Sequence, residues 1–392
     1  MYNEERRLER PYRWAMIGGG RGSQIGYIHR SSANRDGNFT LVAGAFDINA
    51  ERAVEFGSNI GVSPDRCYSD YKVMLEKEKE REDGIEVVSI ATPNKFHYQM
   101  CKDSLEAGLH VICEKPLCFT VAEAEDLKRT AEKHQRTIGV TYGYTGHQMV
   151  HQARKMIENG DIGEVRVISM QFAHGWHSEE VEKNDPGTKW RVSPAVVGST
   201  YVLGDIGTHN LYMAELMVPD FRIKKLLCSR QSFVKSRAPL EDNAFVLLEL
   251  ESGAVANMWA SAVNAGSTHN QKIRVVGSKA SIEWWDEHPN QLAYEVQGEP
   301  KRILDRGTGY LYSDDFMVSM DRIGGGHAEG LFESWANLYN QFAFAMDAQD
   351  RKDTKTLSAM VFPGIDAGIE GVRFLENCVA SADNGSVWVD YK

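Results

Sequence analysis

The sequence lacks the features that mark several large classes of protein. None of its 392 residues belongs to an apolar run near the roughly 18 residues that a membrane-spanning helix needs. The N-terminal region also lacks the apolar core of a secretory signal. We therefore expect a cytoplasmic protein that has no membrane partner.

Paired cysteines and clustered positive charges are missing too. The six cysteines form no C-x-x-C pair, which favours reduced core thiols over a disulfide framework or a structural zinc site. The formal net charge of -11 disfavours nucleic acid, because phosphate binding depends on clusters of Lys and Arg. We therefore expect no nucleic-acid partner.

The chain is long for a single hydrophobic core, so we expect two domains, residues 1–145 and residues 146–392. In the first part, short apolar runs alternate with amphipathic stretches, which is typical of β-α units on a parallel sheet. In the second part, longer alternating strands are joined by hairpin turns, which predicts a mainly antiparallel sheet in an α/β protein. The predicted parallel strands cover residues 13–17, 40–46, 86–91, 110–113 and 137–141, and the predicted hairpins cover residues 245–263 and 272–285.

A glycine-rich turn, "WAMIGGGRGSQIG", follows the first predicted strand and leads into a helix. Gly18 and Gly20 match the fingerprint G-x-G-x-x-G, although Ser23 holds the third glycine position. Such glycines permit a tight turn and a close approach to pyrophosphate, which the helix N-terminus attracts. This context favours a Rossmann dinucleotide site over a plain glycine-rich turn. A P-loop is disfavoured, because the turn lacks the Lys-Ser/Thr ending of that motif. The predicted cofactor contacts here are Gly18, Gly20, Arg21, Gly22, Ser23, Gln24 and Ile25.

An acidic residue, Asp47, follows the second predicted strand, where a carboxylate can accept hydrogen bonds from the adenine ribose. A carboxylate there repels a 2′-phosphate, so the sequence favours NAD over NADP. Arg21 and Arg52 leave NADP open as an alternative, because either side chain could accept a phosphate.

Polar residues also follow the third and fourth predicted strands, in "SIATPNKFH" and "HVICEKPLC". Ligands of open α/β sheets bind outside the carboxyl ends of the strands, so these positions carry functional weight. Pro116 favours an extended backbone at Lys115, which would direct its ammonium group into the crevice. The alternative is a surface lysine that forms an ion pair with Glu114.

A carboxylate and an imidazole lie four residues apart in "LGDIGTHNL". If a helix starts near Asp205, then Asp205 and His209 share one face, and the helix N-terminus keeps the imidazole neutral. A neutral histidine suits the general base that removes a hydroxyl proton. A metal site is disfavoured, because zinc needs at least three protein ligands and no third lies nearby. The structural alternative makes Asp205 a helix cap and His209 a packed residue.

Together with the glycine turn, the motifs A-T-P-N-x-x-H (91–97), E-K-P (114–116) and D-x-x-x-H (205–209) resemble the glucose-fructose oxidoreductase/inositol dehydrogenase (Gfo/Idh/MocA) family. The stretches "GYTGHQMVHQARKMI", "KWRVSP" and "GGGHAEGLFESWANLY" also resemble a longer subgroup of this family, which includes levoglucosan and related sugar dehydrogenases. The resemblance implies a Rossmann domain followed by an α/β domain whose large, mainly antiparallel open sheet often mediates oligomerisation, here as a homodimer or homotetramer. It also implies that Lys115, Asp205 and His209 meet at the substrate hydroxyl. Further implied cofactor contacts are Thr92, Pro93, Asn94, His97, Glu114 and Lys115.

We therefore predict an NAD-dependent dehydrogenase that acts on a secondary hydroxyl of a sugar, anhydrosugar or inositol. In this hypothesis His209 is the base, Lys115 stabilises the developing alkoxide, and Asp205 either binds a hydroxyl or orients the imidazole. The alternative is a catalytically silent dinucleotide-binding sensor. The predicted substrate contacts are Tyr144, Trp176, Trp190, Arg191 and His327.

Overall fold

The structure is a computed structural model that describes residues 7–392, and these residues form two compact units. The first unit contains the chain up to Gly143 together with Trp335–Ile369. The second contains Tyr144–Ser334 and Glu370–Lys392. The domains expected from the sequence, 1–145 and 146–392, stay a prediction. Among the described residues, no helix is long and apolar enough to cross a membrane.

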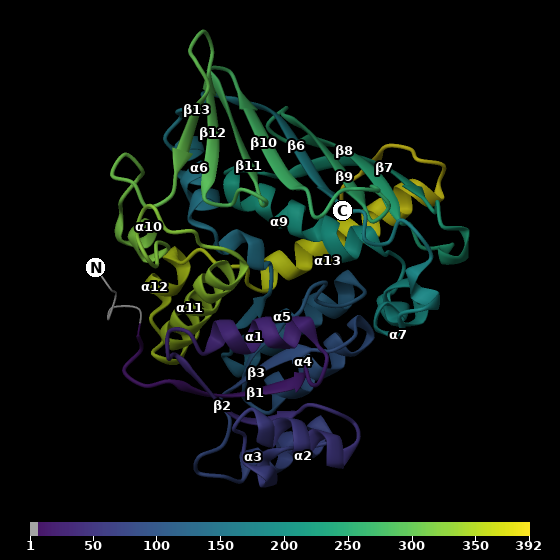
Figure 1. Cartoon of the computed structure of the whole chain (residues 1–392), viewed down its shortest axis with the longest axis vertical. Coiled ribbons are helices and arrows are strands. Elements are labelled where there is room, and N and C mark those ends of the chain that lie inside the picture. The colour runs from purple at the N-terminus through teal and green to yellow at the C-terminus, as the bar shows by residue number, and fades with distance from the viewer. Residues whose placement is uncertain (1–6) are drawn as a thin grey trace. The chain divides into compact units, whose positions relative to one another are not determined.

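The first unit is built on a five-stranded parallel sheet in the order β2-β1-β3-β4-β5, which confirms the predicted Rossmann fold (Figure 1). Each predicted strand is present to within one residue at either end. The strands are β1 (Tyr12–Gly18), β2 (Phe39–Ala45), β3 (Val87–Ala91), β4 (His110–Cys113) and β5 (Ile138–Val140). The helices are α1 (Gln24–Ala33), α2 (Ala50–Asn59), α3 (Tyr71–Lys79), α4 (His97–Glu106), α5 (Val121–His134), α11 (Leu331–Asp350) and α12 (Thr354–Ala359).

The burial of the central strands is typical of a parallel sheet, and the strand order marks the point where a ligand can bind. Strand β4 is buried at every residue and β3 at all but its last, as expected for parallel strands that are covered on both faces. The strand order reverses between β1 and β3, which is the point where open α/β sheets bind ligands. The glycine turn after β1 and the polar loops after β3 and β4 therefore lie beside this point.

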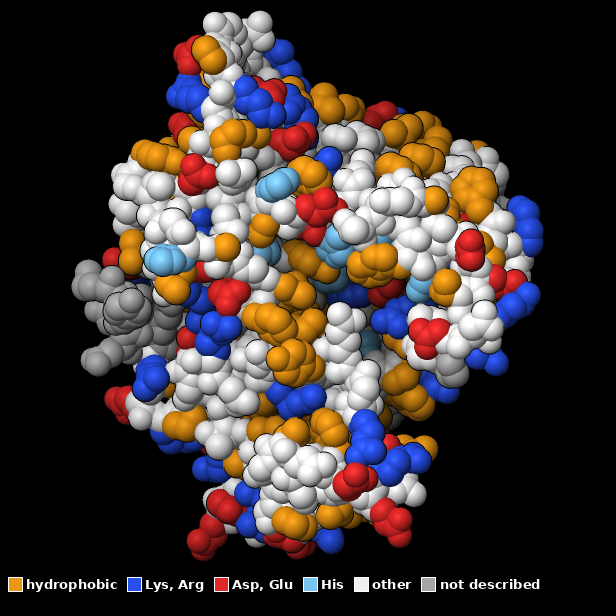
Figure 2. Space-filling view, in the orientation of Figure 1, with side chains coloured by type: hydrophobic (Ala, Val, Ile, Leu, Met, Phe, Trp, Pro, Cys, Tyr) orange, Lys and Arg blue, Asp and Glu red, His pale blue; other side chains and the backbone are white. Residues whose placement is uncertain are grey.

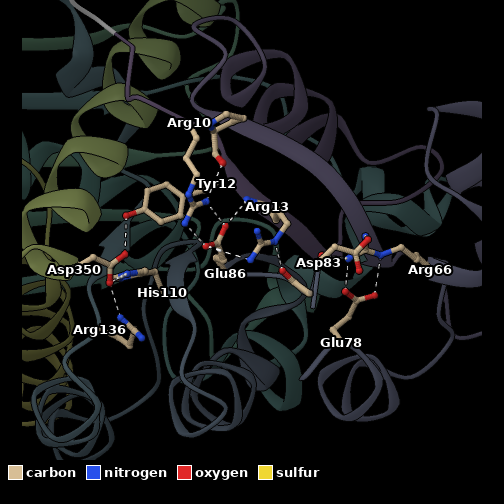
Figure 3. Close-up of polar contacts among 12 residues, drawn as sticks. Arg10, Tyr12, Arg13, Arg66, Glu78, Asp83, Glu86, His110, Arg136 and Asp350 are labelled. Atoms are coloured by element: carbon tan, nitrogen blue, oxygen red, sulfur yellow. Dashed lines mark hydrogen bonds and ion pairs between the residues drawn. The ribbon is translucent and has the colours of Figure 1, made fainter. Parts of the chain in front are cut away.

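Helix α11 comes from late in the chain, and Asp350 at its end attaches it to the amino ends of the strands (Figure 3). The Asp350 carboxylate accepts hydrogen bonds from Tyr12 Oη (2.8 Å), His110 Nε2 (3.1 Å) and Arg136 Nη1 (2.6 Å). The other ring nitrogen of His110 accepts from the backbone N–H of Thr137 at 2.9 Å, which fixes a neutral tautomer. Burial also lowers the pKa of His110.

The second unit is built on a nine-stranded sheet in the order β13-β12-β11-β10-β6-β9-β8-β7-β14. Its neighbours pair antiparallel except β6 and β9, which are parallel, and both predicted hairpins (β8–β9 and β10–β11) are confirmed. The strands are β6 (Val165–Ala173), β7 (Ile223–Gln231), β8 (Asn243–Leu250), β9 (Val255–Ser261), β10 (Gln271–Gly277), β11 (Ala280–Trp285), β12 (Gln291–Val296), β13 (Arg302–Asp305) and β14 (Val389–Asp390). The helices are α6 (Gln148–Glu158), α7 (Pro186–Lys189), α8 (Pro194–Val197), α9 (Thr208–Met217), α10 (Asp315–Ser319) and α13 (Ile365–Asp383).

One face of this sheet is covered by α6, α9 and α13, and the other face is open (Figure 1). On β8 the side chains alternate accordingly, because Val246 is buried while Phe245 and Leu247 are 51% and 46% exposed. Phe245 stacks on Trp259 of β9, with ring centroids 5.9 Å apart. Figure 2 shows hydrophobic side chains, in orange, over the region where Figure 1 labels β7 and β8. The open face is therefore apolar in part.

Candidate active site

The glycine turn has the geometry of a dinucleotide cradle. A Cβ atom at Gly20 would lie 2.3 Å from the carbonyl oxygen of Phe46, so no side chain fits there. Beside Gly22, whose φ is +76°, an added Cβ would have no atom within 4 Å, which leaves open space at the start of α1. The turn can therefore hold a pyrophosphate group against the helix N-terminus.

Ser23 holds the position of the third glycine of the fingerprint. In the structure Ser23 caps the helix, while Gly26 allows the close packing. The Ser23 Oγ caps α1 by accepting from the N–H of Gly26 at 3.1 Å. The close packing falls to Gly26 itself, because a Cβ there would lie 2.2 Å from the carbonyl oxygen of Gly19. Of the other predicted contacts in this turn, Arg21 forms an exposed ion pair with Glu55 at 2.5 Å, and Gln24 and Ile25 begin α1.

Asp47 is partly exposed after β2, and Arg52 binds it through two hydrogen bonds. Arg52 Nη2 donates to Oδ1 at 2.8 Å and Nε donates to Oδ2 at 2.9 Å, while the N–H of Asn49 also donates to Oδ1. The pair with Arg52 holds the pKa of Asp47 below its ordinary value. A carboxylate oxygen accepts about two hydrogen bonds, so Oδ2 retains room for a ribose hydroxyl.

The loop after β3 is tied to the loop after β4 by His97. The ring is fully buried, with Nε2 2.9 Å from the carbonyl oxygen of Thr92 and Nδ1 2.8 Å from that of Pro116. Burial lowers the pKa of His97. Pro93 precedes a short 3-10 turn that starts at Asn94. His97 thus orders the two strand-end loops, and its predicted contact with the cofactor stays a prediction.

Glu114 is a buried carboxylate, 8% exposed, beside the half-buried Lys115. Its Oε1 accepts from Thr141 Oγ1 at 2.6 Å and from His29 Nε2 at 3.1 Å. Burial alone would raise the pKa of Glu114, but the hydrogen bond from His29 and the charge of Lys115 hold it below its ordinary value. Glu114 is therefore a buried carboxylate held by His29 and Thr141, and the role of Lys115 stays a prediction.

In the second unit, Asp205 and His209 lie on consecutive turns of one helical segment. A π-helical turn, Leu203–Gly207, runs directly into α9. Asp205 belongs to this first turn, as predicted, but His209 lies one turn further along, where the helix dipole has less effect on it. His209 is buried, 6% exposed, and Asp205 is partly exposed.

A buried carboxylate that the sequence did not reveal caps this segment. Glu241 is 1% exposed, and its Oε1 accepts from the backbone N–H groups of Tyr201 (2.9 Å) and Leu203 (3.0 Å). Burial raises the pKa of Glu241 to about 7. Glu241 precedes β8, far from the helix in sequence, so no local pattern pointed to it.

Two groups of predicted substrate residues come together around Asp205 and His209. Arg191 Nε lies 3.8 Å from Asp205 Oδ2, and its guanidinium group covers the ring of Trp190 at 4.5 Å. The ring of Tyr144 lies edge-on to that of His209, with centroids 4.9 Å apart. The side of the helix that carries the two motif residues is therefore lined by the predicted aromatic and cationic side chains.

Two further histidines, which belong to none of the sequence motifs, lie in the same cluster. His269 Nε2 lies 3.1 Å from Tyr144 Oη, and its Nδ1 contacts the Asp286 carboxylate. His174 stacks on the exposed Trp176 at 4.3 Å, and burial lowers its pKa to about 4. The second predicted hairpin gave one signal for the contact between His269 and Asp286. Its register pairs Lys272 with Trp285, and just beyond this pair the backbone N–H of Gln271 donates to Asp286.

His327 is exposed on a loop whose carbonyl groups bind Arg306, and its predicted contact with the substrate stays a prediction. Within residues 7–392, no three His, Cys, Asp or Glu side chains are arranged to hold a metal ion.

Family models match both parts of the chain. Residues 12–142 match the oxidoreductase family NAD-binding Rossmann fold of Gfo/Idh/MocA, and residues 154–391 match the family's C-terminal α/β domain. An uncharacterized oxidoreductase of Bacillus subtilis, YfiI, is 57% identical to this chain over the whole length of both. Levoglucosan dehydrogenase of Pseudarthrobacter phenanthrenivorans is 26% identical over 63% of this chain and 65% of its own length.

Among solved structures, an inositol dehydrogenase homologue from Azotobacter vinelandii is 61% identical. Its complex with NAD+ covers 98% of both chains with a TM-score of 0.96. Its complex with NADH and myo-inositol covers the same shares with a TM-score of 0.93.

Proposed function

Because the chain belongs to the Gfo/Idh/MocA oxidoreductase family, we propose that it is an NAD-dependent dehydrogenase of inositol or a related sugar or anhydrosugar. The reaction would move a hydride between the ring carbon that bears a secondary hydroxyl and the nicotinamide, while the hydroxyl proton passes to a base. The observation that carries the proposal is the cluster of Asp205, Arg191, His209 and Tyr144 in a family whose 61%-identical homologue was crystallised with NADH and myo-inositol.

The residues of this chain would share the chemistry as follows. His209 accepts the hydroxyl proton, since a neutral imidazole is a good base near neutral pH. Lys115 stabilises the alkoxide that develops at the oxygen. Bound NAD supplies the hydride acceptor. Asp205, held near Arg191 at 3.8 Å, binds a neighbouring hydroxyl group of the substrate.

The aromatic side chains would bind the apolar face of the ring. The guanidinium group of Arg191 lies over the ring of Trp190, and Trp176, which stacks on His174, is 57% exposed. Such exposed aromatic surface suits the C–H face of a sugar, while the charged groups take its hydroxyls. His327 is exposed, and a contact of its ring with the substrate remains part of the proposal.

Two further features belong to the proposal. The open face of the nine-stranded sheet exposes Phe245 and Leu247, and such a face suits a homodimer or homotetramer. The cytoplasmic location expected from the sequence stays a prediction.

The test is a substrate panel with the purified protein. Inositol isomers, pyranoses and levoglucosan are each incubated with NAD and, in parallel, with NADP, and formation of the reduced nicotinamide is followed. Oxidation of at least one of them, faster with NAD, supports the proposal. Binding of NAD without turnover of any compound would instead support a dinucleotide-binding sensor.

A further inference from the structure

A network of buried side-chain hydrogen bonds crosses the first unit and ends at Glu114, the residue before Lys115. Trp14 Nε1 donates to Ser89 Oγ at 2.8 Å, and Ser89 Oγ lies 2.9 Å from Tyr339 Oη. Tyr339 Oη lies 2.5 Å from His29 Nδ1, and His29 Nε2 lies 3.1 Å from Glu114 Oε1. The first four side chains are at most 1% exposed.

With His29 as a neutral imidazole, the chemistry of the two ends sets the direction of every bond between them. The indole of Trp14 can only donate a hydrogen bond, and an ionised carboxylate at Glu114 can only accept one. Ser89 therefore donates to Tyr339, Tyr339 donates to His29 Nδ1, and His29 donates from Nε2. In this arrangement each donor has an acceptor, and all of them point towards Glu114.

The parallel sheet does not need these side-chain hydrogen bonds to hold its strands together. The members of the network come from β1, β3, α1, α11 and the loop after β4, whose strands already pair through their backbones. A buried polar group is costly unless it is fully hydrogen-bonded, so apolar side chains would serve the core at lower risk. We therefore expect the effect of this hydrogen-bond network at Glu114, where the network ends.

At that end Glu114 is held from three sides. His29 and Thr141 both donate to its Oε1, and its backbone N–H donates to the carbonyl oxygen of Ile90 at 3.0 Å. Fixing Glu114 fixes the peptide that leads into Lys115. Tyr339 brings α11 into this arrangement, which gives the late segment Trp335–Ile369 a part in ordering the strand-end loop.

We propose that His29 and Tyr339 are positioning residues, which hold Glu114 so that Lys115 keeps one orientation for the reaction. This inference rests on the proposed function, in which Lys115 stabilises the alkoxide. The catalytic step gains from this order, because small displacements of a reacting group lower the rate strongly.

Two tyrosines give a matched pair of variants for the test. Tyr339→Phe removes the hydroxyl that binds His29, while Tyr12→Phe removes a buried hydroxyl that binds Asp350 at 2.8 Å at the amino ends of the strands (Figure 3). We expect Tyr339→Phe to lower kcat by roughly tenfold or more while the Kd for NAD changes little. Tyr12→Phe should leave kcat within roughly a factor of two. Equal kcat values for the two variants would overturn the inference.

A second pair tests the donor to Glu114. His29→Gln keeps an N–H that can reach the carboxylate, whereas His29→Phe removes both ring nitrogens. We expect the Gln variant to retain most of the kcat that the Phe variant loses. Similar losses in both variants, at similar thermal stability, would contradict a positioning role.

Hydrogen exchange in the protein without substrate separates this inference from the proposed function. The backbone N–H groups of Glu114, Lys115 and residues 117–119 should exchange faster in Tyr339→Phe than in Tyr12→Phe or the unmodified protein. If no compound is oxidised but this difference is seen, the dehydrogenase proposal fails and the ordering of the loop stands. If the exchange rates are equal, the positioning inference fails whatever the activity.

Discussion

Replacing Glu241 is expected to change both the stability of the second unit and its pH dependence. In Glu241→Leu, the backbone N–H groups of Tyr201 and Leu203 lose their acceptor inside the protein. An unsatisfied buried donor costs about 1–3 kcal/mol, so two such donors predict a loss of about 4 kcal/mol. Glu241→Gln keeps an oxygen for both donors and should avoid most of this loss.

The pH dependence follows from the raised pKa of Glu241. Burial raises this pKa from 4.5 to about 7, so the folded protein binds the proton more tightly than the unfolded chain does. The stabilisation from this proton is fully present below pH 4.5 and is lost as the pH rises through about 7. In Glu241→Gln no such proton exists, so that part of the pH dependence should vanish.

The assay is thermal unfolding of the unmodified protein and both variants at pH 5 and pH 8. We expect Glu241→Gln to gain stability relative to the unmodified protein on going from pH 5 to pH 8, and Glu241→Leu to be the least stable at pH 5. If Glu241→Gln shows the same pH dependence as the unmodified protein, or if Glu241→Leu unfolds at the same temperature, Glu241 does not have this role.

The remaining predictions concern the site and the first unit. Lys115→Met and His209→Ala should each lower turnover by roughly a hundredfold or more with little change in the Kd for NAD, and unchanged turnover in either removes that residue from its role. Asp47→Ala should raise the ratio of kcat/KM for NADP to that for NAD by roughly tenfold, because the repulsion disappears and Arg52 is released to bind the 2′-phosphate; steady-state kinetics with both cofactors checks this. Asp350→Ala should destabilise the first unit by about 2–3 kcal/mol in urea unfolding, since Tyr12 and His110 lose their acceptor, and an unchanged midpoint would contradict the anchoring of α11.

Much of the fold could be predicted because its signals are local. The glycine turn, the apolar runs of the five parallel strands and the two hairpins each lie within a short stretch of chain. The capping box of α5 is equally local, because Thr120 Oγ1 accepts from the N–H of Glu123, three residues further on, at 3.2 Å. The parallel pairing of β6 with β9 was not predicted, because register between distant strands leaves no local pattern.

The contents of the candidate site were predicted less completely, for a related reason. Asp205 and His209 form a recognisable motif, but Glu241 and Asp286 act on the site through contacts that only folding creates. The packing of Tyr339 against His29 likewise joins residues 310 positions apart. A single sequence records which residues are present, while such contacts depend on how the elements pack.

We propose that this protein, with its Rossmann fold and the cluster around His209, oxidises a ring hydroxyl. The most direct test of this proposal is the rate of nicotinamide reduction when NAD and inositol isomers or pyranoses are added to the purified protein and to His209→Ala. We predict reduction of NAD with at least one of these compounds and its loss in the variant. Tight binding of NAD with no reduction by any of them, in either protein, would contradict the account.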